Sequence, residues 1–97
     1  MSVGDVVGDI ITYTGNDSND IRPDINKEWS IHNIYYEGSF DIYISDGVNS
    51  VKIDNVSGYG CINFAIFHLS NAQYMTITEV DGSTGKIAYD GIITKED

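Results

Sequence analysis

A single cysteine and two histidines are the residues of this sequence that could most readily carry catalysis. Covalent catalysis needs a nucleophile with a base within hydrogen-bond reach, so Cys61 would have to be served by His32 or His68. Neither histidine lies near a Gly-x-Ser-x-Gly segment or another nucleophile signature. We therefore expect two structural histidines, a Cys61 that acts as a small buried apolar residue, and no enzyme activity or catalytic residues. A small hydrolase built on these three residues is the weakest alternative.

Two turn-like segments carry enough side-chain oxygens to suggest calcium, namely residues 16–20 (NDSND) and 81–83 (DGS). The ligand spacing of an EF-hand, with its terminal glutamate, is absent from both. Asn, Asp and Ser are also the residues that turns use for local hydrogen bonds to the backbone. The segment 58–60 (GYG) is followed by no helix that could bind a phosphate at its N-terminus. The sequence therefore predicts no metal and no cofactor.

Charge is the strongest compositional signal, because fifteen acidic residues face five basic ones and give a formal net charge of −10. Such a domain repels nucleic acid phosphates and anionic membranes, which predicts neither as a partner. The longest uncharged apolar run, Cys61–Leu69, is too short to cross a bilayer. No apolar leader follows Met1, so synthesis in a cytoplasm is expected. Two interpretations of the acidity remain open: solubility of a small domain, or docking on a basic partner or service in a salty medium.

Short runs rich in Ile, Val, Tyr, Phe and Thr recur about every 8–12 residues, and no window shows the apolar spacing of a helix. Residues 40–44 alternate apolar and polar positions, and the Asp46-Gly47-Val48-Asn49 segment that follows is typical of a hairpin turn. Glu28–Tyr36 is predicted as a strand with Trp29, Ile31 and Tyr35 on one face. Cys61–Leu69, apolar at most positions, is predicted as a central strand.

A length of 97 residues fits one domain and leaves no room for a second, so residues 1–97 are expected to form a single unit of about eight short strands. The fold class is predicted to be all-β, an antiparallel two-sheet sandwich with a jelly-roll-like topology. Residues 1–8 have two possible roles. They form either an arm that adds a strand to a neighbouring molecule or the first strand of the domain's own sheet.

Aromatic residues are the remaining lead, because seven tyrosines and one tryptophan are many for 97 residues. Tyr and Trp bury a large area while keeping a polar group, which makes them frequent at protein interfaces. Aromatic side chains can also stack on sugar rings, or simply cover the two sheets. Together with the apolar N-terminal residues they give the candidate interface set: Val3, Val6, Val7, Trp29, Tyr35, Tyr36, Tyr43 and Tyr59.

Several segments carry a resemblance to known proteins. They are Ile21-Arg22-Pro23, the run from Glu28 to Tyr35, the 46–49 turn, the stretch from Phe67 to Tyr74, and Tyr89-Asp90-Gly91. In this order they resemble small β-sandwich proteins encoded beside capsid genes in tailed phages and their archaeal counterparts. The resemblance covers residues 19–94.

That resemblance implies a virion structural protein, in the first place a capsid decoration (cement) subunit. It would act as a homo-oligomer, with a trimer favoured, bind the major capsid protein and lie on the outer capsid surface. The alternative is a carbohydrate- or receptor-binding module of a phage tail or fibre. That module would expose Trp29 or Tyr43 in a groove beside Asp or Asn side chains.

Overall fold

The computed structural model describes residues 2–63 and 66–96, and these fold entirely into strands and connecting turns. Because the described residues form no helix, none is present that is long and apolar enough to cross a membrane. The nine strands are β1 (Val6–Thr14), β2 (Ser18–Ile21), β3 (Glu28–Glu37), β4 (Phe40–Ser45), β5 (Ser50–Val56), β6 (Tyr59–Ile62), β7 (Phe67–Ser70), β8 (Tyr74–Glu79) and β9 (Thr84–Lys95).

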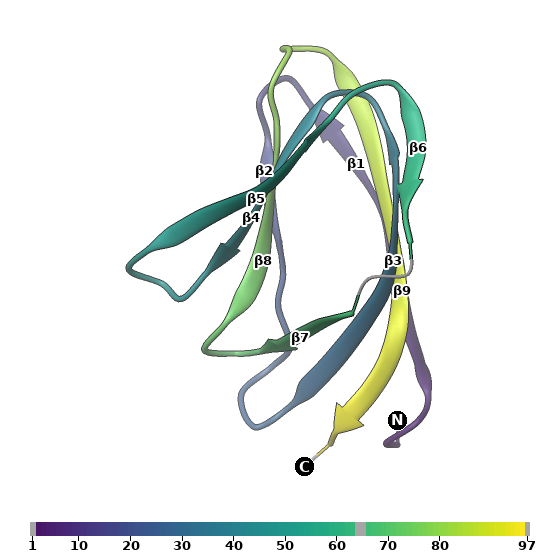
Figure 1. The fold of residues 1–97 in the computed structure, drawn as a ribbon, viewed down its shortest axis with the longest axis vertical. Coiled ribbons are helices and arrows are strands. Elements are labelled where there is room, and N and C mark those ends of the chain that lie inside the picture. The colour runs from purple at the N-terminus through teal and green to yellow at the C-terminus, as the bar shows by residue number, and fades with distance from the viewer. Residues whose placement is uncertain (1, 64–65, 97) are drawn as a thin grey trace.

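The strands form two antiparallel sheets that face each other (Figure 1). The first sheet has the order β1-β9-β3-β6, and β7 pairs with the other half of β3. The second sheet has the order β2-β8-β4-β5. With β6 and β7 counted as one interrupted strand, these are the two four-stranded sheets of a jelly roll. The predicted fold class is confirmed, and the two chain ends lie at the same end of the sandwich (Figure 1).

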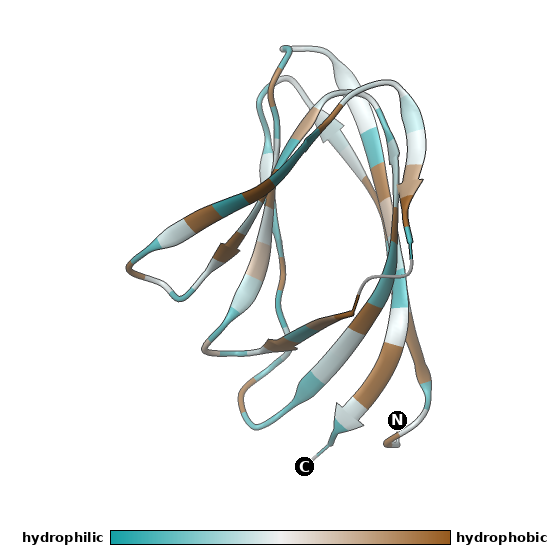
Figure 2. Ribbon diagram, viewed as in Figure 1, coloured by the Kyte–Doolittle hydropathy of each residue, from teal (hydrophilic) through white to brown (hydrophobic). Residues whose placement is uncertain are grey.

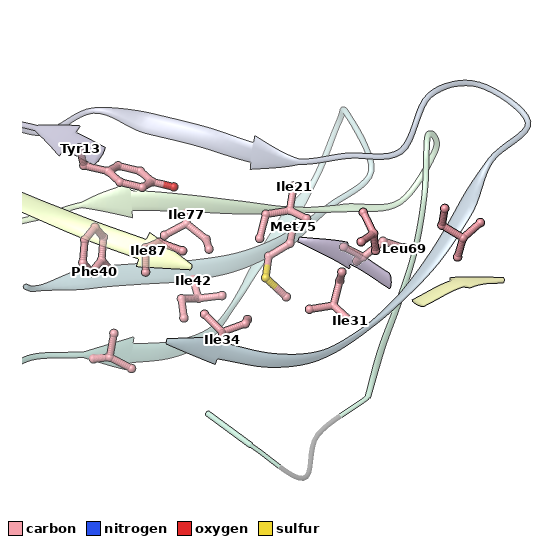
Figure 3. Close-up of a cluster of buried hydrophobic side chains, with 13 residues drawn as sticks. Tyr13, Ile21, Ile31, Ile34, Phe40, Ile42, Leu69, Met75, Ile77 and Ile87 are labelled. Carbon is pink, nitrogen blue, oxygen red and sulfur yellow. The ribbon is translucent and has the colours of Figure 1, made fainter. Parts of the chain in front are cut away.

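Alternation of apolar and polar residues along the strands builds the core between the sheets (Figure 2). Inward-facing side chains of both sheets meet there (Figure 3). The most completely buried apolar members are Tyr13, Ile21, Ile31, Ile34, Phe40, Ile42, Leu69, Met75, Ile77, Ile87 and Ile93. The rings of Tyr13 and Phe40 pack edge to face, with centroids 5.1 Å apart.

The predicted hairpin at residues 46–49 is confirmed, since it joins β4 to β5. Gly47 has a φ of 91°, a left-handed conformation that glycine adopts without steric cost. The Asp46 carboxylate accepts the backbone N–H groups of Val48 and Asn49, and these bonds lower the pKa of Asp46.

The face assignment within β3 was wrong for Tyr35. His32 is the extra residue of a β-bulge, because Ile31 lies opposite Gly91 while Asn33 already lies opposite Asp90. The bulge reverses the alternation, so Ile34 is buried and Tyr35 is on the outer face with 41% of its surface exposed. A period of two cannot reveal such an insertion from sequence.

The prediction of a central strand over Cys61–Leu69 was also wrong. The run forms two short pieces at an edge of the first sheet, β6 against one half of β3 and β7 against the other. Ile62 and Leu69 both pack on the core. They are seven residues apart, and residues an odd number apart cannot face the same way in one regular strand. Phe64 and Ala65, which the predicted strand includes, lie outside the described residues.

From Val6 onward the N-terminal residues pair with β9 as the first strand of the domain's own sheet. Val3 and Gly4 form a turn before it. The Gly4 N–H donates to the Ile93 carbonyl at 2.8 Å.

Candidate protein-binding surfaces

The three residues that could have carried catalysis lie on different strands. Cys61 is on β6 and is exposed, so its predicted role as a buried apolar residue was wrong. Cys61 lies opposite Tyr35. The β3 bulge places the Tyr35 side chain on the outer face of the sheet, and the side chain of its partner Cys61 lies on the same face. His32 occupies the bulge of β3, and His68 is exposed on β7. Within the described residues no hydrogen bond joins Cys61 to either histidine.

The oxygen-rich turns use their carboxylates for local backbone bonds. Asp17 accepts the Thr14 N–H at 2.9 Å, and Asp81 accepts the Ser83 N–H at 3.0 Å. Over residues 2–63 and 66–96, no three His, Cys, Asp or Glu residues gather closely enough to hold a metal ion. The bond from Ser83 to Asp81 is that of an Asx turn, and Asp17 closes its own turn by bonding back to Thr14.

Glu79 joins the two turns at one end of the sandwich. Its side chain is 1% exposed. The Oε1 atom accepts the N–H groups of Asn16 at 3.0 Å and Gly82 at 2.9 Å, and Oε2 accepts the Asp81 N–H at 3.0 Å. Charged acceptors form stronger hydrogen bonds than neutral ones, so this buried carboxylate fastens the β1–β2 turn to the β8–β9 turn.

A concave surface, which encloses a pocket with a volume of about 420 Å³, lies on the outer face of the second sheet. Its lining combines Tyr43 and Tyr74 with strand hydroxyl groups, among them Ser45 and Thr76. The Ser45 hydroxyl bridges Ser50 and Thr76 at 2.8 and 3.2 Å. Much of its polar surface is therefore already bonded within the sheet.

The two tyrosines of that concave surface already face cations of the chain itself. The Arg22 guanidinium lies 4.1 Å from the ring centroid of Tyr74, and the Lys52 ammonium lies 5.9 Å from that of Tyr43. Lys52 also pairs with Asp41 at 3.1 Å. Hydrogen bonding from Asn55, assisted by Lys52, lowers the pKa of Asp41. Stacking of a ligand on these rings would have to displace the cations first.

The predicted interface set divides by burial. Val3, Val6 and Tyr59 are exposed by 62%, 74% and 84%, whereas Val7 belongs to the core at 8%. Three further members, Trp29, Tyr36 and Tyr43, are half-buried, the first two packed against the core. Tyr35 donates its hydroxyl to Asp90 at 2.8 Å, and this bond raises the pKa of Tyr35. The structure does not gather the eight residues on one face.

The negative charge is distributed unevenly. Residues 1–21 contain Asp5, Asp9, Asp17 and Asp20 and no Lys or Arg. These residues form β1 and β2, which are edge strands of their respective sheets. Short turns join β1 to β2, β3 to β4 and β8 to β9, so corresponding strands of the two sheets face each other and both edges lie on one side. We call this side, with its four aspartates, the acidic edge.

Sequence reasoning did not single out the acidic edge or Ile10, which is 72% exposed on β1. The uninterrupted absence of Lys and Arg over the first 21 residues was the available signal. It could not show that β1 and β2 would both become edges on one side, because strand order is set by pairing between distant segments.

Comparison with known proteins gives similarity to solved structures alone. No protein-family model and no curated protein matches the sequence. Among solved structures, the chain is similar to the NLP core of Drosophila, with 13% identity and a TM-score of 0.49 over 96% of this chain and 99% of that one. The Drosophila structure is described as providing insight into pentamer formation and histone binding.

This comparison corrects the virion interpretation. A solved structure that resembles the chain is that of the Drosophila NLP core, described in connection with pentamer formation and histone binding, and not that of a phage capsid decoration protein. The cement subunit, its trimer, the major capsid protein as partner and the outer capsid surface as location are withdrawn. The tail or fibre module is withdrawn with them. The motifs behind the resemblance are turn and strand signals, and unrelated β-sandwiches share such signals.

Proposed function

We propose that this chain is a non-catalytic, acidic jelly-roll domain that binds basic segments of protein partners. The observation that carries the proposal is the excess of carboxylates over cations on the folded surface. The formal net charge is −10. In the described part of the chain, ion pairs engage Lys27 with Glu96, Lys52 with Asp41 and Lys95 with Glu28.

The few cations are thus largely occupied within the molecule. Arg22, which lies over the Tyr74 ring, also donates to the Asn71 carbonyl at 2.8 Å. Most carboxylates of the strands and turns have no such partner, and they set the sign of the field around the protein. A field of one sign attracts oppositely charged partners and speeds their association.

The non-catalytic part of the proposal rests on placement. Catalysis by a side-chain nucleophile needs a base and an orienting group in contact, as well as a cavity that excludes water. Cys61, the single cysteine, is exposed at an edge without a histidine bonded to it. The concave surface of the second sheet is open and lined by hydroxyls that are bonded to one another.

The test is a titration of the purified protein with a fluorescently labelled oligolysine peptide, with labelled oligoglutamate as the control. We expect binding of oligolysine alone. Binding should weaken when ionic strength rises from about 0.1 M to about 1 M, because the screening length falls from about 10 Å to about 3 Å. Absence of binding at the lower ionic strength, or equal binding of both peptides, would refute the proposal.

A further inference from the structure

The four sheet edges differ in how well they are protected against a further strand. β2 has four residues, and the opposite edge of the first sheet is split into the four-residue strands β6 and β7. β5 carries Lys52 and Asp54 and pairs with β4 through a register shift. Shortness, charge and bulges are the usual protections of an edge. Each of these three edges therefore carries at least one of the usual protections.

β1 carries fewer of these protections. It pairs with β9 over nine consecutive residues, from Val6 opposite Ile92 to Thr14 opposite Thr84, without a register shift. Asp9 is its single charged residue. Val6 and Ile10 are 74% and 72% exposed, on the outer face of the sheet. A long, regular and largely uncharged edge with exposed apolar side chains is suited to strand addition.

The hydrogen bonds of β1 show which backbone groups point away from the sheet. In an antiparallel pair, alternate residues bond to the neighbouring strand. The Asp5 carbonyl accepts the Ile93 N–H at 3.0 Å. In the regular pairing that follows, the backbone N–H and C=O groups of the odd-numbered residues of β1 therefore point toward β9. The N–H and C=O groups of Val6, Gly8, Ile10 and Thr12 then face the open side.

Two carboxylates already occupy donors on that open side. The Ile10 N–H donates to Asp9 at 2.8 Å, and the Thr14 N–H donates to Asp17 at 2.9 Å. Each carboxylate oxygen stands in for a carbonyl of the missing neighbouring strand. Asp9 and Ile10 are both exposed, so an incoming strand can replace this bond without disturbing the core.

Charge decides what kind of strand fits. A second copy of this chain would bring its own acidic edge, with Asp5, Asp9, Asp17 and Asp20, against the first. Like charges on paired strands are destabilising. A basic segment has the complementary sign. Because side chains alternate across a strand, its residues beside Val6 and Ile10 would be apolar, and those on the Asp9 side would be Lys or Arg.

We propose that the open side of β1 binds an extended peptide segment in which apolar and basic residues alternate, adding a strand to the first sheet. The inference rests on the proposed binding of basic partners and assigns its place and mode. The backbone of β1 supplies the affinity, and Val6, Ile10 and Asp9 supply the preference for sequence.

The test uses the full chain and a capped peptide of alternating valine and lysine, with the oligolysine peptide alongside. Thr12→Pro removes an N–H that faces the open side, leaves the bonds to β9 and does not change the charge. We expect this variant to bind the alternating peptide about tenfold more weakly. Binding of oligolysine should change less than about twofold.

Asp9→Asn has a matched control in Asp54→Asn on β5, since Asp54 accepts its neighbour's N–H at the same 2.8 Å. Asp9→Asn should weaken binding of the alternating peptide more than Asp54→Asn does. A titration of the unmodified protein followed by amide NMR provides a second measure that does not depend on variant folding. The amides of Gly8, Ile10 and Thr12 should shift most and become protected from exchange.

Unchanged affinity of Thr12→Pro, or largest shifts on β5, would refute strand addition at β1 while the binding of basic segments stands. Failure of the unmodified protein to bind either peptide would refute both proposals. Dimerisation of the protein through β1, seen as a sedimentation mass that Thr12→Pro lowers, would refute the choice of partner.

Discussion

Replacing Glu79 by glutamine should destabilise the domain strongly, although it only exchanges one carboxylate oxygen for an NH₂ group. The carboxylate is 1% exposed and accepts three backbone N–H groups, two at Oε1 and one at Oε2. Glutamine retains one acceptor oxygen, which best replaces Oε1. Its NH₂ group then faces the Asp81 N–H, donor against donor.

The expected loss can be built from these three bonds. Hydrogen bonds to a charged group contribute about 1.5–3 kcal/mol each, and neutral ones about 0.5–1.5 kcal/mol, so the two retained bonds weaken by about 2 kcal/mol together. An N–H left without a partner costs about 1–3 kcal/mol. Glutamine avoids burial of a charge, which offsets part of this loss. A net destabilisation of about 2–3 kcal/mol remains.

For a domain of this size, that loss lowers the melting temperature by about 10–20 °C. Thermal unfolding followed by circular dichroism, together with urea unfolding, measures it. Glu37→Gln is the matched control because Glu37 is exposed at the end of β3, and its effect should stay within about 0.5 kcal/mol. A fall below about 1 kcal/mol for Glu79→Gln would show that the two turns hold themselves without the carboxylate.

Two further substitutions test the buried and charged groups near this end of the sandwich. Tyr13→Phe should raise the free energy of unfolding by about 1 kcal/mol, because the Tyr13 hydroxyl is fully buried, finds no hydrogen-bond partner among the described residues, and its pKa is raised by that burial. Lower stability by urea unfolding would instead show a bond that the hydroxyl makes, for which the Asn19 side chain is the candidate. In acid, where one proton is shared between the Asp81 and Glu79 carboxyl groups, the hydrogen bond with Glu79 and then those with Ser83 lower the pKa of Asp81 from 3.8 to about 2. Asp81 thus stabilises the fold fully above about pH 4, and this contribution is lost as pH falls through about 2. Asp81→Asn should therefore make stability less dependent on pH in that window, and an unchanged acid profile would contradict this.

The local signals in the sequence were sufficient to predict the fold class. Alternation at residues 40–44 and the Asp46-Gly47 turn predicted β4, β5 and their hairpin, and all three are present. Such features depend on neighbouring residues, so they are visible without the rest of the chain. Two antiparallel layers follow from packing nearly all strands of a short chain against one core, whereas the order of the strands within them depends on pairing between distant segments.

The errors concern properties that depend on distant segments. The bulge at His32 lies where β3 pairs with Gly91 and Asp90 of β9, and a Cβ on Gly91 would overlap the Ser30 carbonyl oxygen. An apolar run suggested a central strand at Cys61–Leu69, but edge or centre is decided by which strands pair with it. The virion interpretation relied on the order of turn and strand motifs, which reports architecture and not partners.

The same dependence explains why the acidic edge was not predicted, and it bears on how that edge can be selective. Asp9 both covers the Ile10 N–H and places a negative charge beside it. A neutral or acidic strand would have to displace that carboxylate and leave it near its own side chains. A strand with a Lys or Arg at that position gives the displaced carboxylate a partner. Asp9 thus protects β1 from pairing with its own kind and favours a basic segment, which couples protection of the edge to recognition in one side chain.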